Sequence, residues 1–415
     1  MKLDSLRIHG WRQFGNVDIE FHPRLTVLAG ANGAGKSTLL RLISQHFGNQ
    51  FNILGTPQKN TKGELNYFSG IFKAPKKYNA PDNENSIGHI KYSNGMVAQL
   101  HVPPGGSLLY NVTIPMMIGL DGLFIGSHRP TSNYQAIASI PTNAISVQQA
   151  YQAYHQEVQN KYNNSYSQFS PIYRIKEAIV SMATFGPGNE NVQGNQILNQ
   201  AYNDFKSILS KILPETIGFE DINIRIPDIV IVTRTGEFVL DSASGGLMAL
   251  IDLAWQIFLY SRDKSDFVAV LDEPENHLHP SMQRLIIGNL LKAFPQVQMI
   301  VATHSPFVVS SVRDSSVYVL RYEESSESDG PQSTVFSEKL DSTNKAGTAS
   351  DILRSVLGVP VTLPLWAEEE IDLIASDFNI SELTAETISN LRSRLEQSGL
   401  GDYYAEALGR VAQRK

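Results

Sequence analysis

A glycine-rich stretch near the N-terminus constrains this chain more than any other feature of its sequence. Residues Gly30 to Ser37 read GANGAGKS and match the pattern G-x-x-x-x-G-K-[ST] at every fixed position. A short apolar run that begins at Leu25 precedes them, and a helical apolar pattern that begins at Leu39 follows. Strand, loop and helix thus come in the order of a P-loop. The alternative is a glycine-rich turn before an ordinary helix, but the completeness of the motif predicts a nucleoside triphosphate site.

The residue types within this stretch suit the chemistry of a triphosphate. Glycines let the backbone turn tightly and aim its N–H groups at phosphate oxygens. Lys36 would reach the β- and γ-phosphates, Ser37 would hold Mg²⁺, and the following helix would present its positive end to the anion. The predicted ATP-binding residues are Gly30, Ala31, Asn32, Gly33, Ala34, Gly35, Lys36, Ser37 and Thr38.

Length and composition limit the other possibilities. The 415 residues suggest two or three domains, and the net charge of -7 argues against a generic polyanion-binding surface, although a local basic face stays open. The chain has no cysteine, which excludes disulfides, thiol catalysis and zinc knuckles. The N-terminus MKLDSLRIHGW lacks the apolar core of a signal peptide, and no stretch has the length of a membrane span. We therefore expect a soluble, cytoplasmic protein without a membrane partner.

A second strong signal is the segment VAVLDEPENHLHP. Its apolar residues end at Leu271 and predict a buried strand that delivers Asp272 and Glu273 to its C-terminal end, where α/β sheets bind their ligands. Asp272 would complete the magnesium site begun by Ser37. Glu273, on the other side of the strand end, would polarise the water that attacks the γ-phosphate. Two exposed acids at a strand end are the alternative interpretation.

Two weaker signals accompany these motifs. Ser244, Gly245 and Gly246 precede an amphipathic helix and form a small-residue helix N-terminus, which is an anion site when other evidence supports it. His304 follows the next apolar strand in IVATHSP, and a histidine there could contact the γ-phosphate or orient water. Each signal is weak alone, because many helices begin with Ser-Gly and a lone histidine is usually structural. Their order along the chain strengthens both.

The remaining sequence predicts an α/β protein built around a mixed sheet. Short runs between residues 51 and 141 suit a small antiparallel sheet beside the nucleotide core, and residues 146–212 read as polar helices. Apolar strands are expected at 267–271 and 298–302, and helices from residue 347 onward. The predicted organisation is an N-terminal ATPase lobe (1–145), an inserted helical arm or lid (146–215), a C-terminal ATPase lobe (216–345) and a helical C-terminal region (346–415).

Taken together, GANGAGKS, SASGG, VLDEPENHLHP and ATHSP resemble the ABC-type ATPase superfamily, a group of P-loop NTPases. The opening LRIHGWRQFGNVDIEF and the phrase DEPENHLHP resemble its RecF, SMC and OLD-like branch, over roughly residues 1–50 and 215–360. The resemblance implies an ABC-ATPase head that uses ATP and Mg²⁺, with Ser37 and Asp272 as metal ligands and Glu273 and His304 as catalytic residues. It also implies that Ser244 to Gly246 cap a γ-phosphate bound by a second subunit.

Three positions fit the resemblance less directly. Leu247 stands where transporter subunits usually carry glutamine, which fits the OLD-like branch better. The Q-loop is not obvious, and Gln135 in FIGSHRPTSNYQ is one candidate for it. The sequence SHR within that segment (residues 127–129) could equally contact a partner or nucleic acid. Arg12 is a further candidate for a nucleotide contact, by analogy with a basic residue of related proteins.

The resemblance implies an ATP-hydrolysing subunit that acts as a homo-oligomer with composite sites. ATPases of this shape occur in anti-phage systems such as Septu, PARIS and retrons, where they control a separately encoded effector, expected here to be a nuclease. We find no D-x-D pair after Arg321 and no HNH-like metal cluster, so the chain itself is not expected to be a nuclease. Two rival functions remain: a RecF-like ATPase that binds DNA in repair, and an ATP-gated scaffold with negligible turnover.

Overall fold

The structure is a computed structural model, and the chain in it divides into two compact units, Met1–Gly358 and Val359–Lys415. The described residues are 1–59, 63, 65–72, 85–103, 107–128, 134–140, 142–191, 193–324, 333–341, 345–359, 364–378 and 384–413. Among them, none of the helices combines the length and the apolar character that crossing a bilayer requires.

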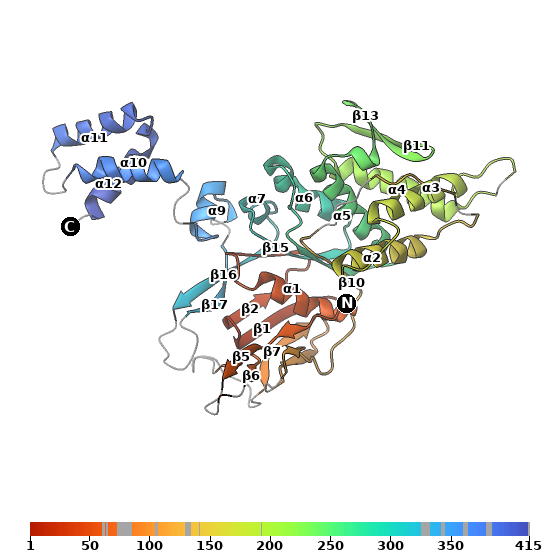
Figure 1. The fold of residues 1–415 in the computed structure, drawn as a ribbon, viewed down its shortest axis with the longest axis horizontal. Coiled ribbons are helices and arrows are strands. Elements are labelled where there is room, and N and C mark those ends of the chain that lie inside the picture. Colours follow the sequence, from red (N-terminus) through yellow and green to blue (C-terminus); the bar gives the residue numbers. More distant parts are fainter. Residues whose placement is uncertain are drawn as a thin grey trace. The chain divides into compact units, whose positions relative to one another are not determined.

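A ten-stranded sheet runs through the first unit, and half of its strands lie parallel to one another (Figure 1). The parallel strands are, in spatial order, β10 (Gly122–Ile125), β14 (Phe267–Asp272), β15 (Val297–Thr303), β3 (Leu25–Gly30) and β16 (Ser316–Glu324). Every residue of β3, β14 and β15 is buried, as expected for strands with helices on both faces. The prediction of buried apolar strands at 267–271 and 298–302 is confirmed.

The other half of the sheet is mostly antiparallel. Its strands are, in spatial order, β17 (Ser333–Lys339), β2 (Phe14–Glu20), β1 (Leu3–Trp11), β7 (Ser86–Tyr92) and β8 (Val97–His101). β17 pairs antiparallel with β16 and parallel with β2, which joins the two halves.

The predicted antiparallel strands between residues 51 and 141 are present, but they do not form one separate sheet. The β7–β8 hairpin extends the main sheet at β1, because alternating apolar residues specify a strand without specifying its pairing partner. Two small ribbons complete this region, formed by β4 (Ile53–Leu54) with β9 (Leu109–Tyr110) and by β5 (Thr56–Lys59) with β6 (Leu65–Phe68).

Side chains of the parallel strands point alternately into two apolar cores. On one face they meet α1 (Lys36–Ser44), which continues into the short helix η1 (Gln45–Phe47). On the other face they meet α5 (Gly245–Ser261) and α6 (Pro280–Ala293). Alternate strand residues such as Val27 and Leu28 therefore belong to different cores. The two cores bury both faces of the parallel strands and so hold in place the strand ends where the P-loop lies.

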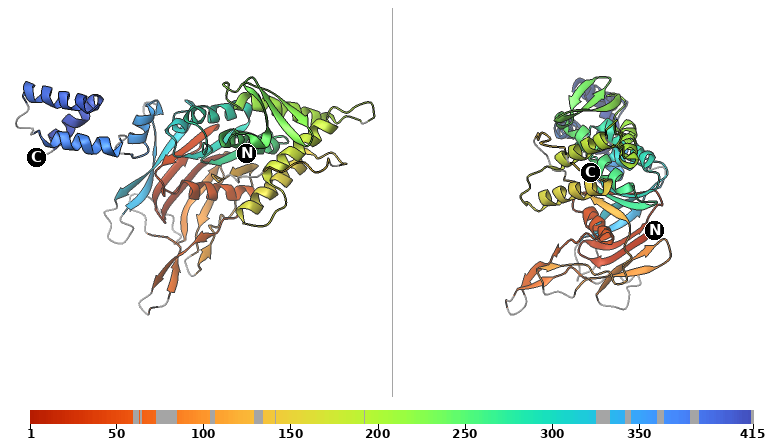
Figure 2. Two further views of the ribbon diagram at one scale, coloured as in Figure 1. Left: turned by 45° about the horizontal axis from the view of Figure 1, so that its top comes forward. Right: turned by 90° about the vertical axis from the view of Figure 1, so that its right-hand side faces the viewer.

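A helical insert covers the same face as α5 and α6 (Figure 2). Its helices are α2 (Val147–Tyr162), α3 (Pro171–Phe185) and α4 (Gln196–Ile212). Each begins at a side chain that accepts a hydrogen bond from the helix N-terminus, namely Ser146, Ser170 and Asn195. α2 packs on α5, and α4 packs on both α5 and α6. These three helices are called the arm below.

A three-stranded sheet follows the arm and leads into α5. It consists of β11 (Phe219–Arg225), β12 (Asp228–Thr233) and β13 (Gly236–Val239), and the short helix η2 (Leu240–Ser242) connects it to α5. The short helices α7 (Pro306–Val309) and α9 (Ala349–Ser355) complete the first unit. The predicted α/β fold with a mixed sheet core, an antiparallel portion and an inserted helical arm is confirmed.

The second unit is helical and has an apolar core of its own. It contains α10 (Leu365–Ser376), α11 (Ala385–Gln397), the short helix η4 (Gly401–Tyr403) and α12 (Tyr404–Gln413). Its fully buried residues include Ile371, Leu391, Leu395 and Val411. The prediction of a helical C-terminal region is confirmed for the described residues.

Candidate nucleotide-binding site

The P-loop connects β3 to α1 at the C-terminal edge of the parallel strands. Gly30 ends β3 with a φ of 144°, and a Cβ there would lie 2.6 Å from the carbonyl oxygen of Leu320. Gly35 precedes α1 with a φ of 94° and packs against the ring of Phe14, so neither position accepts a larger residue. α1 has no side-chain cap. The N–H groups of its first turn are therefore open to an anion at the positive end of the helix.

Lys36, the first residue of α1, folds back over the loop. Its side chain is buried, and Nζ donates to the carbonyl oxygens of Gly30 at 3.0 Å and Ala31 at 3.1 Å. Nζ also lies 2.9 Å from Nε2 of His304. Burial lowers the pKa of Lys36 to about 8, and the carboxylates of the adjacent acidic segment oppose this effect. A bound anion would restore the charge that burial disfavours.

Asp272 ends β14 and meets the P-loop at Ser37. The Asp272 carboxylate is buried and accepts a hydrogen bond from the Ser37 side chain. Its buried Oδ1 has no hydrogen-bond partner among the described residues. Burial raises the pKa of Asp272, while the hydrogen bond from Ser37 lowers it. The carboxylate is thus under-coordinated in the free protein.

A hydroxyl beside an under-coordinated carboxylate fits Mg²⁺ bound to a triphosphate. Magnesium prefers oxygen ligands and takes several of them from water and substrate phosphates. In the part of the chain that the structure describes, no cluster of three or more His, Cys, Asp or Glu side chains could hold a metal ion by itself. The Ser37–Asp272 pair therefore suits a metal ion that arrives with the nucleotide.

Glu273, His304 and Asn276 face one another beyond the end of β14. Glu273 Oε1 lies 3.2 Å from His304 Nε2, and Asn276 Nδ2 donates to Glu273 Oε2 at 3.0 Å. Glu273 has a φ of 47°, and its N–H donates to the Ala302 carbonyl oxygen at 2.9 Å. A non-glycine residue held in this region of φ is typical of a functional site. Burial lowers the pKa of His304, and the charge of Lys36 lowers it further, which favours a neutral imidazole.

Sequence reasoning missed a second buried acid in this segment, Glu275. Its Oε1 accepts hydrogen bonds from the Thr303 hydroxyl and from the His304 N–H, the latter at 3.3 Å. Burial raises the pKa of Glu275, and its Oε2 is buried without a hydrogen-bond partner among the described residues. Glu275 therefore links the segment after β14 to the segment after β15. Its position within the charged run DEPEN gave no sign of burial.

The predicted signature residues lie at the start of α5. The Ser244 side chain caps this helix by accepting from the Leu247 N–H at 3.4 Å, and both Ser244 and Gly245 are exposed. A Cβ at Gly246 would lie 2.8 Å from the carbonyl oxygen of His277, so this loop packs against the segment after Glu273. Within the described residues, no hydrogen bond joins these three signature residues to the P-loop of the same chain. Their free side faces solvent.

Arg12 lines two cavities next to the P-loop helix. Its Nη1 donates to the Leu54 carbonyl oxygen at 3.5 Å. One cavity has a volume of about 540 Å³ and lies over β5 and β6. The other has a volume of about 230 Å³ and adjoins Thr38 of the P-loop motif. Arg41 lies over the ring of Phe51 at 5.4 Å in the wall of this second cavity. An aromatic ring and two guanidinium groups suit a nucleoside, and sequence reasoning missed Phe51 and Arg41.

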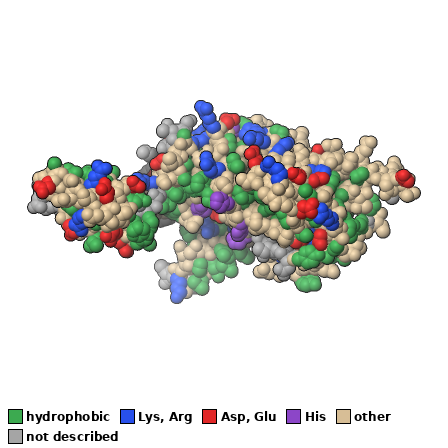
Figure 3. All heavy atoms as spheres, turned by 90° about the horizontal axis from the view of Figure 1, so that it is seen from above, with side chains coloured by type: hydrophobic (Ala, Val, Ile, Leu, Met, Phe, Trp, Pro, Cys, Tyr) green, Lys and Arg blue, Asp and Glu red, His purple; other side chains and the backbone are tan. Residues whose placement is uncertain are grey.

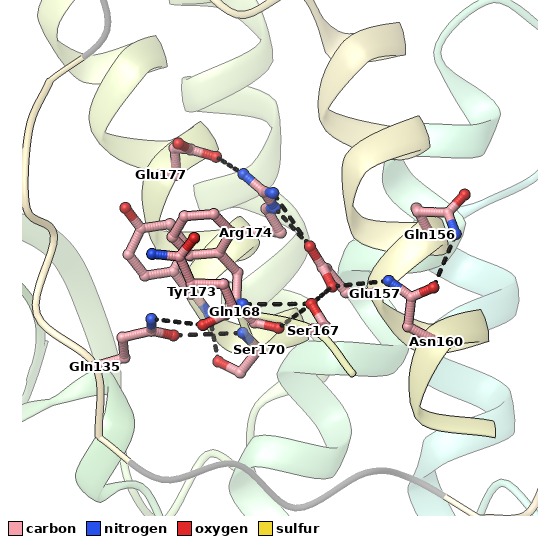
Figure 4. A network of polar contacts seen from close by, with 11 residues as sticks. Gln135, Gln156, Glu157, Asn160, Ser167, Gln168, Ser170, Tyr173, Arg174 and Glu177 are labelled. Atoms are coloured by element: carbon pink, nitrogen blue, oxygen red, sulfur yellow. Dashed lines mark hydrogen bonds and ion pairs between the residues drawn. The ribbon is translucent and has the colours of Figure 1, made fainter. Parts of the chain in front are cut away.

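Gln135, the candidate for the Q-loop, lies among the arm helices. Its side chain accepts from the Ser170 N–H at 3.3 Å and donates to the Gln168 carbonyl oxygen at 3.0 Å (Figure 4). The end of β10 lies nearer the site, because Ser127 and His128 line a cavity of about 550 Å³ together with Asp272. Residues 129–133 of the same segment lie outside the described residues. Gln135 is therefore not among the residues that line this cavity with Asp272.

Charges of both signs are interspersed on the face of the molecule shown in Figure 3. Lys and Arg side chains do not form a continuous basic stripe on this face, and Asp and Glu side chains lie between them. A protein that binds the phosphate backbone of nucleic acid would present such a stripe. The net charge of -7 leans against the DNA-binding rival, which stays an open alternative.

Two family models match the chain over both halves of the site. A model described as an AAA domain matches residues 5–213, which is half of the chain. The chain belongs to this AAA-domain family. A second model, described as "AAA domain, putative AbiEii toxin, Type IV TA system", matches residues 134–310. The P-loop lies in the first match, and Ser244, Asp272 and His304 lie in the second.

Curated relatives of this AAA-domain protein include proteins of two named systems. The Septu protein PtuA of Bacillus mycoides (strain KBAB4) is 22% identical over an alignment of 410 residues, and the match covers 95% of this chain and 50% of PtuA. The "Retron Ec83 probable ATPase" of Escherichia coli is 29% identical over an alignment of 146 residues, and the match covers 30% of this chain and 27% of that protein. The chain spans half or less of the length of these relatives. The resemblance inferred from the motifs is confirmed at the level of the family.

Among solved structures, the SMC head domain from Thermotoga maritima matches with 16% sequence identity and a TM-score of 0.43. The match covers 82% of this chain and 100% of that chain.

ATP binding without magnesium should weaken as the pH rises above the Lys36 pKa of about 8. A bound triphosphate holds the proton on Lys36, so each pH unit above this value should lower the affinity by up to about tenfold. Fluorescence titration with an ATP analogue from about pH 7 to about pH 10 measures the effect. Lys36→Arg keeps its charge in this range, so its affinity should stay constant. An equal slope in both proteins would contradict the assignment to Lys36.

Proposed function

We propose that this chain binds ATP with Mg²⁺ and hydrolyses it to ADP and phosphate at a site shared between two copies of the chain. One observation carries the proposal. Lys36 and Ser37 meet Asp272, Glu273 and His304 at a single edge of the sheet, although these residues come from distant parts of the sequence. Membership of the AAA-domain family supports the same chemistry.

Binding would use the groups that are under-coordinated in the free protein. The N–H groups from Ala31 to Thr38 would cradle the phosphates, and Lys36 would leave its carbonyl partners for the β- and γ-phosphate oxygens. Ser37 and Asp272 would hold Mg²⁺, which neutralises charge on the transferred phosphate. The nucleoside would occupy the cavity beside Arg12 and Phe51.

Hydrolysis would use Glu273 as the base for the attacking water. Its carboxylate lies beside His304, and Asn276 fixes one of its oxygens at 3.0 Å. His304, which contacts both Glu273 and Lys36, would reach the γ-phosphate once the lysine moves to the nucleotide. The pKa of His304 is lowered by burial, so it would act as a neutral hydrogen-bonding group.

The second copy would supply its signature loop. Ser244 and Gly245 are exposed at the N-terminus of α5, where a helix presents partial positive charge. A γ-phosphate held on the P-loop of a partner copy would complete this anion site. The arrangement would account for the lack, among the described residues, of a hydrogen bond between Ser244 to Gly246 and the P-loop of their own chain.

Glu273→Gln should abolish phosphate release while ATP binding persists. The amide keeps the hydrogen-bonding shape but cannot take a proton, and loss of a general base lowers rates by about 10²–10⁴. Phosphate release and ATP affinity, measured on the wild type and the variant, test the assignment. Equal and negligible release from both proteins, with ATP bound, would favour the scaffold function and reject hydrolysis.

Ser244→Arg should prevent ATP-dependent self-association. The long cation would fill the space in which a partner's γ-phosphate is expected, while the P-loop of the same chain stays intact. Light scattering of Glu273→Gln with ATP would show the assembled state, and the added Ser244→Arg change should keep the chains apart. The matched control is Ser210→Arg, the same change at an exposed serine of α4. Equal assembly in both double variants would contradict a composite site.

We further propose that ATP binding and hydrolysis control a separately encoded effector, a nuclease, in an anti-phage system. The similarity to the Septu protein PtuA, which extends over 95% of this chain, supports the proposal. Closure of two copies on ATP would change the surface that the effector contacts, and an infection trigger would shift the balance between closed and open assemblies.

An effector of this kind should co-purify with the chain. Affinity purification from cells that carry the native gene neighbourhood should recover a neighbouring gene product in stoichiometric amount. Its recovery should change at least severalfold between wild type and Lys36→Ala, because the variant cannot hold the triphosphate. Recovery of this chain alone under both conditions would contradict the effector proposal while leaving the ATPase assignment intact.

A further inference from the structure

A fully buried lysine joins the arm to the segment that leads into the signature loop. Lys176 lies on α3, and its side chain is 0% exposed. Its Nζ donates to Asp241 Oδ2 at 2.7 Å and lies 3.5 Å from Asp228 Oδ1. Tyr134 completes the cluster, because its ring faces Nζ at 5.0 Å and its hydroxyl donates to Asp228 Oδ2 at 3.1 Å.

Asp241 stands three residues before Ser244. It belongs to η2 (Leu240–Ser242), whose single turn is closed by the hydrogen bond from the Ala243 N–H to the Leu240 carbonyl oxygen. The Asp241 side chain is 8% exposed, so its charge is buried together with that of Lys176. The Lys176–Asp241 ion pair therefore holds η2 against α3. The signature loop begins directly where η2 ends.

Burial makes this contact sensitive to geometry. Two charges removed from water attract strongly at short range, but their desolvation is unfavourable, so a buried pair adds little net stability compared with apolar side chains. Such a pair instead defines one arrangement of the elements that carry it. Here those elements are α3 of the arm, the start of β12 and η2.

A second ion pair on the same helix has, within the described part of the chain, no hydrogen bond or ion pair to the signature loop. Arg174 donates to Glu157 of α2 at 3.1 Å and to Glu177 of α3 at 2.8 Å, and the Glu157 side chain is 5% exposed (Figure 4). Arg174 therefore joins arm helix to arm helix. Arg174 lies two residues from Lys176 and also pairs with a buried acid. A variant of Arg174 therefore shows the effect of losing a buried ion pair of the arm while the Lys176–Asp241 pair stays intact.

We propose that Lys176 is a positioning residue of the ATPase: its ion pair with Asp241 sets the signature loop in the orientation that completes the site of a partner copy. The inference rests on the proposed composite ATPase. Its consequence is that the arm controls hydrolysis in trans, since a displacement of α3 moves Asp241 and with it Ser244. The P-loop of the same chain is unaffected.

Lys176→Met tests the proposal by splitting binding from turnover. The chain should bind ATP with an affinity within about twofold of wild type, while kcat falls about 10- to 100-fold because the signature loop is misplaced. Asp241→Asn, which keeps the side-chain shape, should have the same effect. Arg174→Met, the matched control, should keep kcat within about twofold of wild type.

A mixing experiment shows whether the defect acts across the interface. Lys36→Ala lacks a working P-loop but keeps its signature loop, so an equal mixture with Lys176→Met contains assemblies with one intact composite site. The mixture should hydrolyse more ATP than the sum of the two proteins assayed alone.

The outcomes distinguish this inference from the proposed function. Normal kcat in Lys176→Met or Asp241→Asn, or an equal loss in Arg174→Met, would overturn the positioning role alone. Failure of the mixture to regain activity would also overturn it, because the defect would then lie in the fold of the variant chain. Should Lys176→Met not fold, Asp241→Asn decides by the same measurements. Absence of turnover in the wild type would overturn the proposed function, and this inference with it.

Discussion

The parallel register of β14, β15 and β3 is the constraint on which the rest of the site depends. Asp272 of β14 pairs with Ala302 of β15, and Ala302 pairs with Leu28 of β3, so the three strands end at one edge. The strands are buried on both faces, and none can slip without leaving backbone groups unpaired in an apolar core. The segments that follow them must therefore start side by side. This is how Lys36, Asp272 and His304 come together from three distant parts of the chain.

Burial at this edge of the sheet shifts the pKa values of acids and bases in opposite directions. It lowers the pKa of Lys36 and raises the pKa values of Asp272 and Glu275, because desolvation disfavours the charged form of each. Desolvation thus opposes the charged form of each of these groups in the free site. A magnesium-bound triphosphate brings both signs of charge and would stabilise the ionised forms on each side. Nucleotide binding and protonation of the site are linked for this reason.

The sequence predicted those parts of the site whose chemistry lies within one short segment. GANGAGKS identifies Lys36 by local pattern, and an apolar run that ends in acids identifies Asp272, while the catalytic roles of the site residues remain predictions. Glu275 was missed because its burial depends on β15, which lies elsewhere in the chain. The pairing of Lys176 with Asp241 was missed for the same reason. The β7–β8 hairpin was predicted as strands, but its place at the edge of the main sheet depends on a long-range pairing that no local pattern encodes.

The signature loop is held from two sides within its own chain. Lys176 holds Asp241 before it, and the carbonyl oxygen of His277 packs against Gly246 within it. His277 lies in the same short segment as Glu273, and both have positive φ values, 70° and 47°. A change in this strained segment would therefore reach the signature loop directly. In the proposed two-copy assembly that loop serves the other site. Chemistry at the Glu273 of one copy is then coupled to the site that the same copy completes for its partner, and the Lys176–Asp241 ion pair links the arm to the same loop.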